Sequence, residues 1–373
     1  MDNLIKEIME YLERGYDVPT IKKKLKVDDE LIEIAKARIN AKDKDYSVEI
    51  WSDLSGIRYS THELVAKYRA ERLKPEAIAD VSCGIGIQLI HFAKFAKKAI
   101  GVDIDSKKIE YAKKNAESYG IKHITFIVGD SLSEEVINQI KVDIIFSDPA
   151  RDEFAKERKL EDLKPNPILI YETYKKITDK FVFDLPPQIQ REKIPWKGEF
   201  EYIELNGEIN RLTFYSEKLA KAERSAVILP ENLIITNHFK KSEVITTKEV
   251  MNYIYEVPVS VVYADLLQEF LGLFDKKLYL LSLEKKRTFL TSHEEVISNY
   301  FKNIYVLKYK AINDIGLLNK VLKENDYGKA IIKFNVDSSQ YWKLRKSIEF
   351  GLKGNKVAYI LKINDQYLIC EKI

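Results

Sequence analysis

The stretch AIADVSCGIG at residues 77–86 determines how the middle of the chain is expected to fold. A short apolar run leads into a turn with glycines at positions 84 and 86, and a helical pattern follows at residues 87–97. Glycine has no Cβ atom, so the backbone can turn sharply there and can come close to a ligand. A strand, a glycine-rich turn and a helix in this order are typical of the ligand-binding end of an open α/β sheet.

Three later apolar runs also lead into acidic residues, namely Asp103, Asp130 and Asp148. The runs alternate with helical segments, which predicts a parallel, doubly wound sheet. Because the carboxyl ends of parallel strands meet at one edge of a sheet, we expect these acids to lie near Asp80. In that position Asp103 suits two ribose hydroxyls, and Asp130 suits an adenine amino group.

Beyond residue 185 the segments between strands become short, and strands are expected at 200–205, 211–215 and 226–229. Short turns join antiparallel neighbours, so the α/β sheet is expected to be mixed. Further along, the pattern predicts a helix at 259–270 and a mixture of helices and strands up to the end of the chain.

The composition excludes several classes of protein. The 373 residues are 45% hydrophobic and 32% charged, which is enough for real cores and too apolar for a disordered chain. The two cysteines, Cys83 and Cys370, exclude a disulfide framework and an all-cysteine zinc site. No run of 18 apolar residues occurs, and the charged first residues are unlike a signal peptide. We therefore expect a soluble, cytoplasmic protein that needs neither a membrane nor a metal.

The two ends of the chain are the candidates for contact with nucleic acid. Residues 1–44 predict three short helices, which fit either a helix-turn-helix unit or a small bundle packed on the next domain. Their ten basic and ten acidic residues balance. Residues 329–373 carry nine basic and four acidic residues, a net charge of +5, which fits either an electrostatic footprint for RNA or a solvated lysine-rich surface.

The glycine turn favours S-adenosylmethionine over a dinucleotide as the ligand. A dinucleotide fold expects a third glycine at position 89, where this chain has Leu89. The carboxylate of Asp80 repels phosphate and suits a cationic ammonium. S-adenosylmethionine has an ammonium, a ribose and an adenine, and it has no phosphate.

These residues resemble the class I S-adenosylmethionine-dependent methyltransferases. Trimethylguanosine synthases of small RNA caps show similar D-x-x-C-G-x-G, V-D-I-D and N-A-x-x-Y-G-I motifs, which this chain matches at 80–93, 102–105 and 115–121. Those enzymes carry S-P-P-W after the fourth strand, whereas this chain has D-P-A-R at 148–151. D-P-A-R, followed by L-E-D-x-x-P at 160–165, resembles a second group, the class I methyltransferases with a C-terminal THUMP-like domain.

Together with the N-terminal helices, the resemblance implies four parts. They are an N-terminal helical domain at 1–44, a seven-stranded Rossmann-like methyltransferase domain at 45–230, a ferredoxin-like α+β region at 231–298 and a THUMP-like domain at 299–373. THUMP domains in related enzymes dock structured RNA, so tRNA or another structured RNA is the expected partner. The oligomeric state stays open. Where the family usually has K-L-S-P after the fifth strand, this chain has D-L-P-P at 184–187, without the basic residue.

The strand ends and the family motifs, which include S-T-H-E-L-V-A-K-Y-R-A at residues 60–70, define the expected site. The expected cofactor-binding residues are Thr61, Asp80, Ser82, Cys83, Gly84, Gly86, Asp103, Ile104, Gly129, Asp130 and Ser131. The expected catalytic residues are Asp148, Pro149 and Arg151.

The expected reaction is methylation of an exocyclic amino nitrogen of an RNA base. Asp148 and the carbonyl of Pro149 would orient the amino group, and Arg151 would contact a phosphate or the base. No aromatic residue occupies position 151, which leaves Phe154 or His62 to stack on the base. A nucleophilic role for Cys83 is the weaker alternative. Two other functions remain open, an RNA-binding module on a non-catalytic scaffold and a small-molecule methyltransferase.

Overall fold

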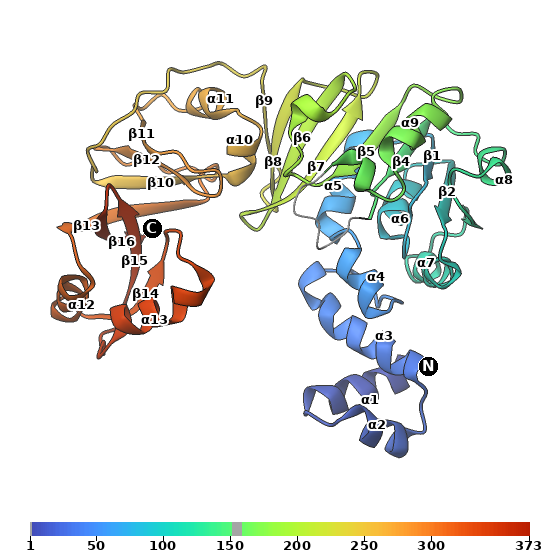
Figure 1. Ribbon diagram of the computed structural model, residues 1–373, viewed down its shortest axis with the longest axis horizontal. Coiled ribbons are helices and arrows are strands. Elements are labelled where there is room, and N and C mark those ends of the chain that lie inside the picture. Colours follow the sequence, from blue (N-terminus) through green and yellow to red (C-terminus); the bar gives the residue numbers. More distant parts are fainter. Residues whose placement is uncertain (1, 151–158) are drawn as a thin grey trace. The chain divides into compact units, whose positions relative to one another are not determined.

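The computed structural model describes residues 2–150 and 159–373 (Figure 1). The chain forms two compact units. The first comprises residues 1–205 and 210–223, and the second comprises residues 206–209 and 224–373. No helix among the described residues is both long enough and apolar enough to cross a membrane.

The first unit begins with three helices that the sequence predicts, α1 (Asp2–Glu13), α2 (Val18–Leu25) and α3 (Asp29–Asn40). Asp17 and Asp28 cap α2 and α3 by accepting the backbone N–H groups of Thr20 and Leu31 at 2.8 and 3.0 Å. Their apolar faces belong to a core that also contains Ile85 and Tyr111 from the sheet region. This is the packing of a bundle on its neighbouring domain.

A short segment connects these helices to the sheet. It contains η1 (Ala41–Lys44), α4 (Leu54–Tyr59) and α5 (Glu63–Leu73). Glu63 is buried and joins the segment to the sheet, because it accepts hydrogen bonds from Ser47 and from the Tyr119 hydroxyl, at 2.6 and 2.7 Å. The N-terminal part and the sheet of the first unit therefore share one core.

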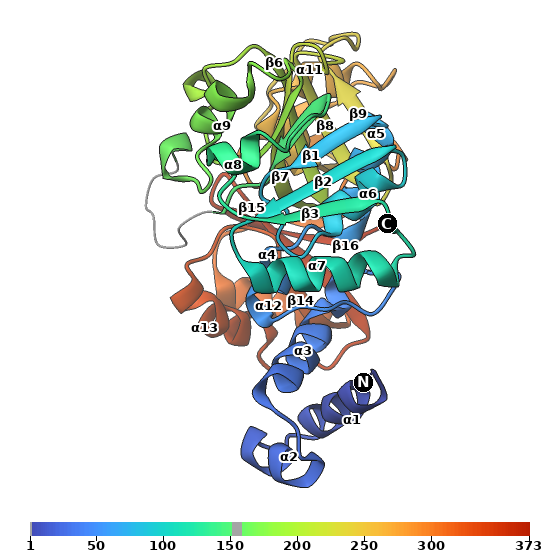
Figure 2. The same cartoon turned by 90° about the vertical axis from the view of Figure 1, so that its right-hand side faces the viewer.

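The sheet of the first unit confirms the predicted α/β fold. Its strands are β1 (Ala77–Asp80), β2 (Lys98–Asp103), β3 (Ile124–Val128), β4 (Ile144–Ser147), β5 (Phe181–Leu185), β6 (Gly198–Leu205) and β7 (Glu208–Ser216). The strand order within this unit is β3-β2-β1-β4-β5-β7-β6. Strands β1 to β5 pair in parallel, and β7 runs antiparallel to β5. Figure 2 shows β1, β2 and β3 side by side, with α7 running along them.

The connections in this unit include α6 (Ile87–Ala93), α7 (Ser106–Ser118), α8 (Glu134–Ile137), η2 (Leu160–Asp162), α9 (Pro167–Tyr174) and η3 (Arg191–Lys193). Helix α6 ends earlier than the predicted residue 97, since Phe95 and Ala96 both donate to the carbonyl of Phe92. The tightened turn brings the chain into β2 at Lys98.

The second unit starts with the antiparallel pair β8 (Arg224–Leu229) and β9 (Leu233–Thr236). The prediction of a single helix at 259–270 is wrong. It is divided into α10 (Val259–Tyr263) and α11 (Leu267–Leu271), because Asp265 adopts a left-handed φ of 55° that no helix can continue through.

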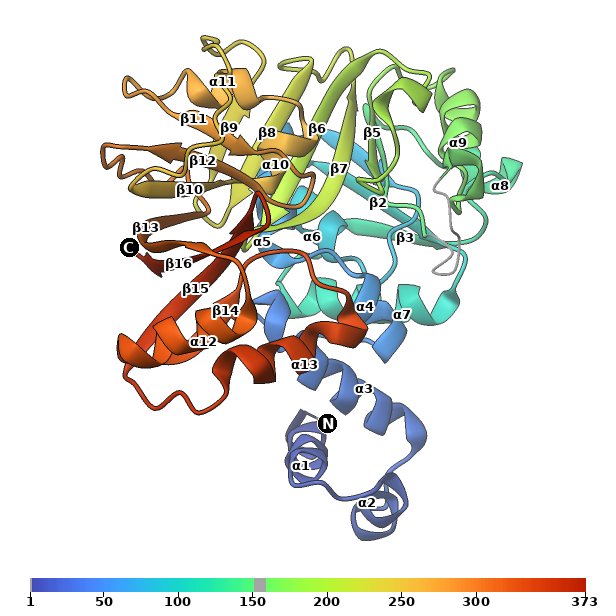
Figure 3. The ribbon, with the colours of Figure 1, turned by 60° about the vertical axis from the view of Figure 1, so that its left-hand side comes forward.

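The rest of the second unit is a sheet in the order β11-β12-β10-β13-β16-β15-β14. Its strands are β10 (Tyr253–Val257), β11 (Tyr279–Ser282), β12 (Thr288–Ser292), β13 (Asn303–Ile312), β14 (Tyr327–Ile332), β15 (Lys356–Ile363) and β16 (Gln366–Lys372). Helices α12 (Ile315–Glu324) and α13 (Ser338–Glu349) pack beside β14 (Figure 3). Because β10 pairs with β13, one sheet runs across the expected boundary at residue 298. The ferredoxin-like and THUMP-like assignments stay predictions.

Candidate active site

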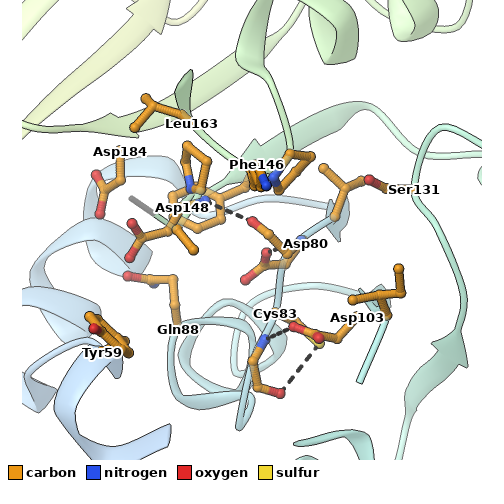
Figure 4. Close-up of a pocket in the computed structure, with 18 of the residues that line it drawn as sticks. Tyr59, Asp80, Cys83, Gln88, Asp103, Ser131, Phe146, Asp148, Leu163 and Asp184 are labelled. Carbon is orange, nitrogen blue, oxygen red and sulfur yellow. Dashed lines mark hydrogen bonds between the residues drawn. The ribbon is translucent and has the colours of Figure 1, made fainter. Parts of the chain in front are cut away.

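A cavity of about 1090 Å³ opens in the first unit, where β1 to β4 end (Figure 4). Pockets for small ligands typically enclose about 300–1000 Å³, so a whole cofactor and part of an acceptor fit. Twelve of the expected site residues line it: Thr61, Asp80, Ser82, Cys83, Gly84, Asp103, Ile104, Gly129, Asp130, Ser131, Asp148 and Pro149. Gly86 does not line it, and Arg151 lies outside the described residues.

The glycine turn and Asp103 hold each other in place. Gly84 has a φ of 53° and no atom within 4 Å of where a Cβ would be, so its exposed main chain can lie against a ligand. Its N–H donates to Oδ2 of Asp103 at 2.8 Å, and the N–H of Asp105 donates to Oδ1 at 3.0 Å. Each oxygen keeps a lone pair for a ribose hydroxyl. A Cβ on Gly86 would come within 3.0 Å of the Ala112 Cβ, so this glycine allows the loop to pack on α7.

Carboxylates make the cavity attractive to cations. Asp80 is buried and accepts the N–H of Ser82 at 3.1 Å. Burial raises its pKa well above the usual value, and the nearby carboxylates of Asp148, Asp103 and Asp184 raise it further. Such a field disfavours a phosphate-bearing ligand and favours a positively charged one. The residues present therefore fit S-adenosylmethionine, which carries an ammonium and a sulfonium.

The part of the cavity beside the ends of β2 and β3 combines apolar and polar groups. Ile104 is 74% exposed although it lines the cavity, which offers an apolar surface for an adenine ring. Asp130 accepts the N–H of Leu132 through Oδ1 at 2.9 Å. The Tyr174 hydroxyl donates to the carbonyl of Ser131 at 2.7 Å, so α9 fixes this strand end from behind.

The loop after β4 is held on both sides. Its Asp148 N–H donates to Ser82 Oγ at 3.0 Å, and Ser82 Oγ lies 2.9 Å from Ser147 Oγ. Two residues on, Ala150 exchanges both main-chain hydrogen bonds with Lys164, at 2.7 and 2.9 Å. The main chain at Asp148 and Pro149 is therefore fixed before any substrate binds.

A buried ion pair replaces the missing basic residue after β5. Arg69 is fully buried and donates through one nitrogen to both oxygens of Asp184, at 2.7 and 2.6 Å. Thr213 Oγ1 donates to the same carboxylate at 2.7 Å. Arg211 of β7 also lines the cavity, and its guanidinium lies 3.7 Å from both Asp148 Oδ2 and Asp184 Oδ2. The quoted family motifs contain Arg69 and Asp184, but sequence reasoning gave neither a role, and no motif surrounds Arg211.

Two of the expected alternatives are not supported by the geometry. His62 is buried, does not line the cavity and caps α5 by accepting the Leu64 N–H at 3.2 Å, so it is not placed to stack on a base. Burial raises the pKa of the Cys83 thiol well above its usual value, which disfavours the thiolate that a nucleophile requires. Phe154 lies outside the described residues.

Comparisons with known proteins agree with this geometry. The RNA cap guanine-N2 methyltransferase family matches residues 75–258. A 23S rRNA (uracil(747)-C(5))-methyltransferase of Vibrio vulnificus is 30% identical over 134 residues, which is 35% of each chain. The trimethylguanosine synthase of Schizosaccharomyces pombe is 40% identical over 89 residues, 22% of this chain and 37% of that protein.

Similarity in structure extends further than similarity in sequence. A solved protein from Porphyromonas gingivalis W83, described as a methyltransferase, matches with a TM-score of 0.74 at 16% identity, covering 98% of this chain and 97% of that one. The sequence matches span 35–37% of the two relatives named above. By its sheet, its cavity and these similarities, the chain belongs to the class I S-adenosylmethionine-dependent methyltransferases.

Proposed function

We propose that this protein transfers the methyl group of S-adenosylmethionine to an exocyclic amino nitrogen of an RNA base. The observation that carries the proposal is the fixed loop after β4, which presents the Asp148 carboxylate and the Pro149 carbonyl at the cavity. Both are hydrogen-bond acceptors, as an amino group requires. When bound, the cofactor would supply a methyl group on its sulfonium sulfur, and that sulfur leaves readily as a neutral thioether.

Asp148 has two duties in this reaction. By accepting one N–H of the amino group it directs the nitrogen lone pair toward the methyl carbon, and the Pro149 carbonyl accepts the other N–H. As the N–C bond forms, the bond from the methyl carbon to sulfur would break and sulfur would keep its electron pair. The nitrogen becomes positively charged and must lose one proton, which the Asp148 carboxylate takes up. Arg211 lies 3.7 Å from Asp148 Oδ2 and forms an ion pair with that carboxylate.

The cysteines favour nitrogen over carbon as the methylated atom. The relative from Vibrio vulnificus is named for C5 of uracil, a carbon that needs activation by a covalently attached nucleophile. Both cysteines of this chain are buried, and burial raises the pKa of each thiol. Neither is suited to that task, whereas Asp148 is suited to an amine.

A cluster of cations in the second unit supports RNA as the substrate. The buried carboxylate of Glu256 faces three cations, the Arg287 Nε at 3.6 Å, the Lys302 Nζ at 3.7 Å and the Lys333 Nζ at 3.9 Å. We call these four residues the Glu256 cluster. One carboxylate cannot neutralise three cations, and the other acid beside Lys302, Glu208, is 88% exposed. The surplus positive charge suits an RNA phosphate, in agreement with the net charge of +5 at residues 329–373.

The test is to identify the product. Pools of transcribed RNA are incubated with the protein and isotope-labelled S-adenosylmethionine, digested, and analysed for modified nucleosides by mass spectrometry. We expect label on an amino nitrogen of one nucleoside. Label on a base carbon would contradict the chemistry proposed for Asp148. RNA binding without transfer would indicate a non-catalytic scaffold, and label only in small molecules would exclude RNA as the substrate.

A further inference from the structure

Tyr59 is an exposed aromatic side chain inside the cavity. It is the last residue of α4, lines the cavity and is 44% exposed. Among the described lining residues the other aromatic is Phe146, which is fully buried beneath the Arg69 guanidinium, 5.3 Å from the ring centroid. Tyr59 therefore presents the one accessible aromatic surface among the described residues of the cavity wall.

Its position separates Tyr59 from the cofactor side. In Figure 4 it lies at the lower left, whereas Asp103 and Ser131 lie at the right, and Asp148 and Gln88 lie between them. The cofactor residues that hold ribose and adenine are thus on one side of Asp148, and Tyr59 is on the other. That other side is where an acceptor must enter to reach Asp148.

Lys44 holds the main chain on both sides of Tyr59. Its Nζ donates to the carbonyl of Arg58 at 3.3 Å and to the carbonyl of Ser60, the two neighbours of Tyr59 in the chain. Nearby, the Tyr46 hydroxyl donates to the carbonyl of Thr61 at 2.9 Å. The segment before α4 therefore fixes where the Tyr59 side chain starts, as a preorganised binding group requires.

We propose that Tyr59 stacks on the acceptor base, and that Lys44 positions it by binding the carbonyls of Arg58 and Ser60. This rests on the proposed function and narrows its substrate to a planar, unpaired base that is turned into the cavity. A flat ring against Tyr59 places its exocyclic amino group at the ring edge, which is the part that can reach Asp148. An aliphatic amine has no surface to stack and is excluded as the acceptor.

The pKa of Lys44 is lower than that of an exposed lysine. Burial and, less strongly, the cation of Arg211 together lower its pKa to about 8, while the carboxylate of Asp148 opposes the change. Lys44 is thus within electrostatic reach of the two side chains at the acceptor end of the cavity. A pH profile of substrate affinity is therefore a useful second measurement for its variants.

The experiment compares Tyr59→Leu, Tyr59→Phe and Lys44→Met with the unaltered protein, using the transcribed RNA that it methylates. Stacking of a base on an aromatic ring corresponds to a loss of about 5- to 150-fold in affinity when the ring is removed. We expect Tyr59→Leu to raise the KM for RNA by a factor in this range and to change kcat less, while Tyr59→Phe retains more affinity. The dissociation constant for S-adenosylmethionine should not change.

The matched control is Tyr16→Leu, because Tyr16 is 41% exposed in the connection between α1 and α2 and does not line the cavity. Lys44→Met should raise KM in the same direction, and adding it to Tyr59→Leu should have little further effect, since both act through one ring. Additive effects of the two changes would overturn the positioning role. Unchanged KM and kcat for Tyr59→Leu would overturn the stacking role.

A second measurement separates this inference from the proposed function. Saturation-transfer NMR with the four nucleosides, in the presence of S-adenosylhomocysteine, detects base protons in contact with the protein. We expect such contact in the unaltered protein and its loss in Tyr59→Leu. If the protein methylates no RNA but this contact is present, the proposed function fails and the stacking role stands. If the contact is absent, the stacking role is wrong.

Discussion

Two buried carboxylates, one in each unit, are neutralised in different ways. In the first unit both oxygens of Asp184 accept hydrogen bonds from one nitrogen of Arg69, at 2.7 and 2.6 Å. In the second unit the carboxylate of Glu256 receives hydrogen bonds from Asn303 and Tyr305, at 2.7 and 3.1 Å, while its three cations stay 3.6–3.9 Å away. Asp184 is thus hydrogen-bonded directly to one cation, and the second cation near it, Arg211, is shared with Asp148 at 3.7 Å. Glu256 instead faces three cations, none of them within hydrogen-bond distance.

This difference assigns the two regions different tasks. A fully buried pair with direct hydrogen bonds fixes structure, and the Arg69–Asp184 pair joins α5 to β5. A cluster with surplus positive charge has donors left for an anion that comes from outside. Cofactor chemistry should therefore depend on the first unit, and the salt dependence of RNA binding should depend on the second.

The largest effect on stability is expected from breaking the Arg69–Asp184 pair. Arg69→Met leaves the Asp184 carboxylate buried without its partner and should lower the free energy of unfolding by about 3–5 kcal/mol. Urea denaturation measures this. The double variant Arg69→Met/Asp184→Leu should recover much of the loss, because no uncompensated charge remains. A single variant within about 1 kcal/mol of the unaltered protein would show that the pair does not hold the fold.

Glu63 is another buried carboxylate with direct hydrogen-bond partners, and it should make the stability of the protein depend on pH. Although burial opposes this, hydrogen bonds from Lys67, Ser47 and Tyr119 lower its pKa to about 2. Because the folded pKa lies below the unfolded one, the stabilisation is present above the unfolded value and is lost as pH falls toward 2. That difference corresponds to about 3 kcal/mol. Unfolding of Glu63→Gln should depend less on pH between about 4.5 and 2.

His91 provides the control for this acid range. It lies 3.9 Å from Glu63, and its pKa is lowered to about 4, first by burial and then by Lys94. A buried neutral histidine loses stability as pH falls from its unfolded pKa through this value. His91→Gln should therefore flatten the profile at higher pH than Glu63→Gln does. Equal profiles for both variants and the unaltered protein would contradict these assignments.

Asp103→Ala should separate the cofactor site from the RNA site. Losing the hydrogen bonds to a carboxylate should weaken S-adenosylmethionine binding by about 1.5–3 kcal/mol, measured by titration calorimetry. The salt dependence of RNA binding should stay as it is. Unchanged cofactor affinity would remove Asp103 from the site.

The smallest effect is expected from Lys333→Met in the Glu256 cluster. Glu256 keeps two cations and two neutral donors, so stability should change by less than about 1 kcal/mol. The slope of log affinity for RNA against log salt should fall by about 0.7–0.9, the value for one lost phosphate contact. Lys346→Met, an exposed lysine of α13 with the same change in charge, should leave the slope nearly unchanged. Equal slopes for both variants would rule out phosphate docking at this cluster.

The sequence predicted the parts of the site that follow from local order along the chain. Asp80, Asp103 and Asp148 end strands or directly follow them, and a parallel sheet brings strand ends to one edge. Arg69 meets Asp184 across 115 residues, and no spacing rule connects an α5 arginine with a β5 acid. Arg211 is on an antiparallel strand without a motif, and Tyr59 depends on hydrogen bonds from Lys44 to main-chain carbonyls. Such long-range contacts appear only in the folded chain.

The most direct test of the account is the single-turnover rate of methyl transfer to the RNA substrate in Asp148 variants. Misplacing a nucleophile by about 1 Å reduces the rate about 100-fold, so Asp148→Ala should lose at least that factor while its affinity for S-adenosylmethionine stays nearly unchanged. Asp148→Asn keeps an acceptor oxygen and should fall between the alanine variant and the unaltered protein. A wild-type rate in Asp148→Ala, corrected for the folded fraction, would contradict the catalytic role.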